Sequence, residues 1–76
     1  MIQVTLGTNT DRTKILADPS KTPREILEEN NIEYASGNIR LDSNPIGGSE
    51  LDMSLNELGV NEKCYLIVVV KANGGN

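Results

Sequence analysis

The sequence predicts a small α+β roll, in which a mixed sheet of four or five strands packs on one main helix. Two observations carry this prediction. The continuous apolar run from Leu66 to Val70 is rich in β-branched residues, which is typical of a central strand. One complete helix start signal occurs near Thr22, and one helix of that size can cover one face of one small sheet.

The length and composition indicate one small domain with an aliphatic core. A chain of 76 residues has room for one domain, and we expect it to span residues 1–73, with residues 74–76 as a flexible C-terminal tail. The sequence has no Phe and no Trp, and its two aromatic residues are Tyr34 and Tyr65. The core must therefore be built from Ile, Leu and Val.

The charge balance argues against nucleic acid and membrane surfaces as partners. Seven Lys and Arg residues stand among eleven Asp and Glu residues, which gives a net charge of -4. No apolar run approaches the roughly 20 residues of a membrane span, and the N-terminus lacks the pattern of a signal peptide. The single cysteine cannot form an internal disulfide. We therefore expect a cytoplasmic protein, and a monomer.

The N-terminal segment predicts a hairpin. Ile2, Val4 and Leu6 alternate with polar residues, which indicates a strand with one buried face. A turn-rich stretch at residues 8–12 separates it from a second extended segment at residues 13–17. Two short strands joined by a few polar residues form a hairpin.

The segment after the hairpin predicts the main helix. Thr22 can cap it, Pro23 fits its first turn, and Glu25 can reach back to complete a capping box. Asn30-Asn31 end it, because Asn tolerates the left-handed backbone found at helix C-termini. Three apolar side chains should bury the helix against the sheet: Ile26, Leu27 and Ile32.

The second half predicts two more strands. Residues 38–42 read as a strand with Ile39 and Leu41 inward and Arg40 outward, ended by Asn44-Pro45. Residues 46–53, which contain two adjacent glycines, are expected to form a long irregular connection.

A second capping box precedes the last strand. Ser54 and Glu57 form the box, and Gly59 ends the segment, so one turn of helix is expected. The last strand should then run from Cys64 to Lys71.

The chain at this point resembles the ubiquitin-like β-grasp family over nearly its whole length. The resemblance lies in the element order, in Asp18-Pro19-Ser20 before the capping Thr22, in the turn through Ser54-Leu55 and Leu58-Gly59-Val60, and in Gly74-Gly75 after the last strand. It implies that the first and last strands lie side by side and parallel at the sheet centre. The chain also resembles, more loosely, small β-grasp proteins of unknown role on bacterial mobile elements.

The diglycine gives one functional hypothesis. In ubiquitin-like modifiers, and in the sulfur carriers of thiamine and molybdopterin synthesis, such a tail is the end that an activating enzyme modifies. Here Asn76 follows Gly75, so a protease would have to remove it before the carboxylate of Gly75 could be activated. The alternative is that Gly74 and Gly75 belong to a frayed chain end.

The outward face of the last strand gives the other hypothesis. If Leu66, Val68 and Val70 face the helix, alternation turns three apolar residues outward, beside Arg40 on the neighbouring strand. Those three are Tyr65, Ile67 and Val69. They could bind a protein partner, or the long connection could cover them, and a shift of one residue would exchange the two sets. Because ubiquitin has an apolar residue where Arg40 stands, the usual ubiquitin receptors are not expected as partners.

The sequence contains no recognisable catalytic or metal site. Cys64 has no His in the chain to act as its base, and a buried, inert thiol explains it better. Glu50 and Asp52 lack the spacing of a calcium loop, and Gly47-Gly48-Ser49 lacks the lysine of a phosphate loop. We therefore expect no cofactor and no enzyme, but an interaction module, with the covalent carrier as the alternative.

Overall fold

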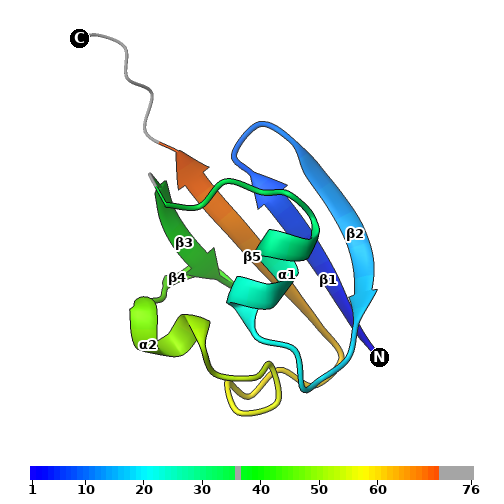
Figure 1. Ribbon diagram of the computed structural model, residues 1–76. Coiled ribbons are helices and arrows are strands. Elements are labelled where there is room, and N and C mark those ends of the chain that lie inside the picture. Colours follow the sequence, from blue (N-terminus) through cyan, green and yellow to red (C-terminus); the bar gives the residue numbers. More distant parts are fainter. Residues whose placement is uncertain (36, 71–76) are drawn as a thin grey trace, which may run out of the picture.

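The computed structural model describes residues 1–35 and 37–70, and Figure 1 shows how its elements are arranged. The elements follow one another as β1 (Ile2–Thr8), β2 (Arg12–Ala17), α1 (Pro23–Glu29), β3 (Gly37–Leu41), β4 (Asn44–Pro45), α2 (Gly48–Leu51) and β5 (Lys63–Val70).

The five strands form one mixed sheet in the order β2-β1-β5-β3-β4. β5 lies between β1 and β3, parallel to β1 and antiparallel to β3. The parallel pairing of the first and last strands is therefore confirmed. Figure 1 shows α1 lying across one face of this sheet, and we call the opposite face the outer face.

The core fills the space between the sheet and α1, and it is aliphatic as expected. Leu66 and Val68 on β5 are fully buried. On α1, the exposed fractions of Ile26 and Leu27 are 1% and 0%. Ile32 packs against this cluster from the segment that follows α1. The alternation along β5 thus has the predicted phase, although Val70 is exposed at the end of the strand.

The start and the end of α1 match their sequence signals. The hydroxyl of Thr22 accepts from the N–H of Glu25 at 3.1 Å, and the carboxylate of Glu25 accepts from the N–H of Thr22 at 3.0 Å. At the C-terminus Asn31 has φ +58°, and the N–H of Ile32 donates to the carbonyl of Leu27 at 2.9 Å. This hydrogen bond and the left-handed residue form a Schellman motif, which ends the helix.

Two expectations for residues 44–53 were wrong. Residues 48–51 form the short helix α2 instead of an irregular connection, because the carboxylate of Glu50 accepts from the N–H of Gly47 at 2.8 Å and Leu51 is buried. Asn44-Pro45 was expected to end the third strand, but β3 already ends at Leu41, and Asn44-Pro45 forms β4, which pairs with β3. The turn before β4 places Asp42 and Ser43 at positive φ, which non-glycine residues seldom adopt.

The segment after α2 has the predicted capping box but forms a turn, not a helix. The N–H of Ser54 donates to the carboxylate of Glu57 at 2.9 Å, and the N–H of Glu57 donates to the hydroxyl of Ser54 at 3.1 Å. Gly59 then takes φ +86°, and the N–H of Val60 donates to the carbonyl of Leu55 at 3.0 Å. A Schellman motif therefore closes the segment after a single turn.

Candidate functional site

The four residues predicted to bind a partner lie together on the outer face. Tyr65 is 50% exposed, Ile67 and Val69 are half-buried, and Arg40 is exposed. Strand register explains their proximity, since Arg40 pairs with Ile67 across β3 and β5. With Asn9, Arg12 and Ser43 they line a hollow of about 200 Å³.

The turn between β3 and β4 fixes one side of this hollow. The carboxylate of Asp42 accepts from the N–H of Tyr65 at 2.9 Å, and the N–H of Asp42 donates to the carbonyl of Tyr65 at 2.9 Å. The guanidinium of Arg40 donates to the carbonyl of Ser43 at 3.4 Å. These contacts position Tyr65 and Arg40 relative to each other.

Three basic residues on the outer face were not included in the predicted site. Arg12 and Lys14 lie on β2, and Lys63 begins β5. The register places Lys14 opposite Thr5, and Thr5 opposite Tyr65, so β2 brings its cations to the same face. Lys14, Lys63 and Tyr65 line a second hollow of about 80 Å³, together with Gln3, Thr5 and Cys64. Alternation along residues 13–17 would have found Lys14, but only strand order places it near Tyr65.

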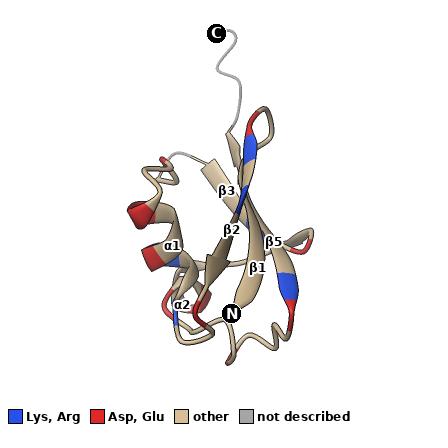
Figure 2. Ribbon diagram, turned by 90° about the vertical axis from the view of Figure 1, so that its right-hand side faces the viewer, with Lys and Arg blue, Asp and Glu red and all other residues tan. Residues whose placement is uncertain are grey.

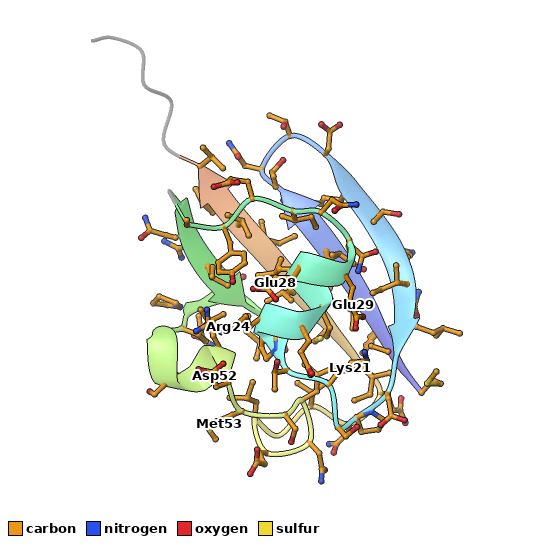
Figure 3. The ribbon with its side chains drawn as sticks, in the orientation of Figure 1. Lys21, Arg24, Glu28, Glu29, Asp52 and Met53 are labelled. Atoms are coloured by element: carbon orange, nitrogen blue, oxygen red, sulfur yellow. The ribbon has the colours of Figure 1, made fainter. Side chains whose placement is uncertain are left out.

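The cations on the helix side of the molecule are paired with acids. Lys21 forms an ion pair with Glu29, and the guanidinium of Arg24 binds the carboxylate of Asp52 at 2.8 Å (Figure 3). The Arg24 hydrogen bond holds the pKa of Asp52 below its ordinary value, and the same bond raises the pKa of Arg24. Arg24 also lies 5.9 Å from the ring centre of Tyr34, so this cation joins α1 to two other segments.

Charge is therefore divided between the two sides of the domain. Figure 2 shows acidic positions on α1 and basic positions on β2 and β5. Arg12, Lys14, Arg40 and Lys63 are exposed on the outer face. Among residues 1–35 and 37–70, none of these four takes part in an ion pair. Four cations thus lie on one face of a chain whose net charge is -4.

The thiol of Cys64 lies in the core at 2% exposure. Burial raises its pKa to about 11, and the charge of Asp42 acts in the same direction. A thiol with a raised pKa is protonated at neutral pH and reacts slowly. Cys64 therefore packs as a small apolar side chain.

The predicted diglycine tail lies outside the described residues. Gly74 and Gly75 belong to residues 71–76, which the structure does not describe. Within residues 1–35 and 37–70, no cluster of three or more acidic or cysteine side chains could hold a metal ion. No helix in that same part of the chain is long and apolar enough to cross a membrane.

Comparison with solved structures establishes the fold. A ubiquitin-like protein from Trypanosoma brucei matches with a TM-score of 0.70 at 18% identity, over 93% of this chain and 95% of that one. The ubiquitin of Caldiarchaeum subterraneum matches with a TM-score of 0.67 at 10% identity, over 97% and 98% of the two chains. The chain has the ubiquitin-like β-grasp fold.

One similar structure comes from an enzyme. A chain from the phenol hydroxylase of Pseudomonas sp. OX1 matches with a TM-score of 0.70 at 17% identity, over 99% of this chain and 77% of that one. No family model matches the sequence, and no curated protein matches it either. The comparisons thus establish the fold alone, and the role of the chain must be argued from its own residues.

Proposed function

We propose that this chain is a non-enzymatic protein-interaction module, and that it binds its partner through the outer face around Tyr65, Ile67, Val69 and Arg40. The observation that carries the proposal is the position of Ile67 and Val69. Both are β-branched apolar residues on a central strand, and both point away from the core that α1 covers. They line an open hollow beside the half-exposed ring of Tyr65.

Such a surface has the composition of an interface centre. Interface centres are enriched in aromatic residues and Arg, and polar groups surround them. The hollow contains Tyr65 and two aliphatic side chains, with Arg12 and Arg40 at its border. A partner side chain entering it would remove apolar area from water at about 25 cal/mol per Å².

Photo-crosslinking tests this proposal. A photoreactive phenylalanine analogue replaces Tyr65, and crosslinked partners are collected from an extract of the native cells. The double variant Ile67→Asp/Val69→Asp should lose the crosslinked species, because buried carboxylates cannot be solvated in an apolar interface.

A matched control separates this effect from added charge. Ser49→Asp/Asn56→Asp adds the same two charges at exposed positions of α2 and the following turn. Circular dichroism and thermal unfolding check that all variants fold. The proposal fails if the Ile67→Asp/Val69→Asp variant folds and still yields the crosslinked species, or if the control loses it equally.

A further inference from the structure

Tyr65 stands between two hollows, and each hollow contains two cations. Arg12 and Arg40 border the 200 Å³ hollow, which also contains Ile67 and Val69. Lys14 and Lys63 border the 80 Å³ hollow on the other side of the tyrosine. An aromatic ring with an apolar hollow is thus flanked by basic groups that come from β2, β3 and β5.

These four cations differ in their ion pairing from the cations on the helix side. Lys21 and Arg24 are neutralised by Glu29 and Asp52. The four cations of the outer face have no acidic partner within residues 1–35 and 37–70, and all four are exposed. Acidic groups of a bound molecule could therefore pair with them without breaking an existing ion pair.

Asp42 is an acidic residue on the same side, and its carboxylate already has a hydrogen-bond partner. Its carboxylate accepts from the N–H of Tyr65 at the end of β3. It is thus engaged by the backbone and forms no ion pair with Arg40, which donates instead to the carbonyl of Ser43. The residues that line the two hollows include four cations and no acid.

We propose that the partner of the outer face is an acidic protein segment that places an apolar side chain in the hollow beside Tyr65. This proposal rests on the proposed function and adds the chemistry of the partner. The aliphatic lining of Ile67 and Val69 suits a side chain such as Leu, and Arg12 and Arg40 of the same hollow suit the carboxylates of an acidic segment. A long polyanion such as nucleic acid is disfavoured by the net charge of -4 of the whole chain.

A peptide-display selection against the whole chain tests the proposal. Short random peptides are selected at low salt, and the charge of the enriched sequences is compared with that of the starting library. The enriched peptides should be acidic and contain at least one large aliphatic residue. Their affinity should fall when the salt rises from about 0.02 M to about 0.5 M, because screening weakens attraction between exposed charges.

A pair of variants with equal net charge makes the test specific. Lys14→Gln/Lys63→Gln removes two outer-face cations, whereas Ser49→Glu/Asn56→Glu adds two acids elsewhere. Both variants lower the net charge by two from the -4 of the chain. The first should weaken binding of a selected peptide by about tenfold, and the second by less than about threefold, since close charge pairs exceed long-range effects.

The outcomes separate this proposal from the proposed function. Neutral or basic peptides that still need Ile67 and Val69 would overturn the acidic partner and leave the binding face standing. Peptides unaffected by Ile67→Asp/Val69→Asp would overturn both. Equal loss in the two charge variants would show attraction by overall charge and overturn the assignment of the cations. Sedimentation could also show salt-sensitive self-association that Lys14→Gln/Lys63→Gln abolishes. A second copy of the chain would then be the occupant, and the acidic partner would be overturned.

Discussion

Asp42 and Tyr65 exchange two hydrogen bonds of 2.9 Å each, one through the Asp42 carboxylate and one through its N–H. In the first bond the acceptor is a side-chain carboxylate, whereas in a regular sheet it would be a backbone carbonyl oxygen. It joins the turn after β3 to the strand that carries the candidate binding surface.

The Asp42 bond should be measurable in stability. Asp42→Ala removes the acceptor from the N–H of Tyr65 and leaves alanine at φ +51°, so the free energy of unfolding should fall by about 1–2 kcal/mol. Asp42→Asn keeps an acceptor and tolerates the backbone, and it should stay within about 0.5 kcal/mol of the parent. Urea unfolding measures both. Equal losses in the two variants would contradict a role for the carboxylate oxygen.

Replacing Gly7 in β1 should strongly lower the free energy of unfolding. Its φ is +151°, and an added Cβ would lie 2.0 Å from the carbonyl oxygen of Asp11. Gly7→Ala should therefore cost about 2–4 kcal/mol in the free energy of unfolding. Gly48→Ala is the control, because a Cβ there meets no atom within 4 Å, and helix propensity favours alanine. Thermal unfolding would contradict this account if the Gly7→Ala and Gly48→Ala variants melted at the same temperature.

The ion pair between Arg24 and Asp52 predicts a pH dependence. Because the hydrogen bond from Arg24 lowers the folded-state pKa of Asp52 below its ordinary 3.8, its stabilisation is present above that value and disappears as the pH falls through the lower folded pKa. Asp52→Asn should thus melt at a lower temperature than the parent at pH values above about 5, and the two curves should converge at strongly acidic pH. A gap that stays constant over the whole pH range would show that the Asp52 charge does not contribute.

The carrier alternative predicts a processed chain. If Gly75 is activated, intact mass spectrometry of protein from native cells should find a species that ends at Gly75, or one heavier by a sulfur. A variant in which Gly75 is replaced by Ala should lose the sulfur-bearing species. A full-length species ending in Asn76 under every growth condition would exclude this alternative.

Local signals predicted the parts of the fold that local chemistry decides. Thr22 and Glu25 mark the start of α1, because their side chains bond to the neighbouring backbone. Asn31 marks its end, because it takes the left-handed backbone at φ +58°. The alternation of Leu66 and Val68 gave the phase of β5, and with it the outward direction of Ile67. These features need no knowledge of distant segments.

The features that were missed depend on contacts between distant segments or on turn geometry. α2 begins with two glycines of poor helix propensity, and it forms because Glu50 caps it and Leu51 enters the core. β4 requires a turn with Asp42 and Ser43 at positive φ. Neither position is a glycine, so the sequence did not indicate this turn. The convergence of β2 and β5 cations around Tyr65 follows from strand register, which the sequence pattern does not specify.

The position of β5 between β1 and β3 has a consequence for how the domain is assembled. The middle strand of the sheet is the last strand along the chain. The hairpin β1–β2 and the hairpin β3–β4 can therefore join into one sheet with a common core only after β5 has paired with both. Closing so long a loop is entropically slow, which makes the joining of β5 the expected rate-limiting event in folding. Until that moment the side chains that later face the helix stay open to water and to other unfolded chains.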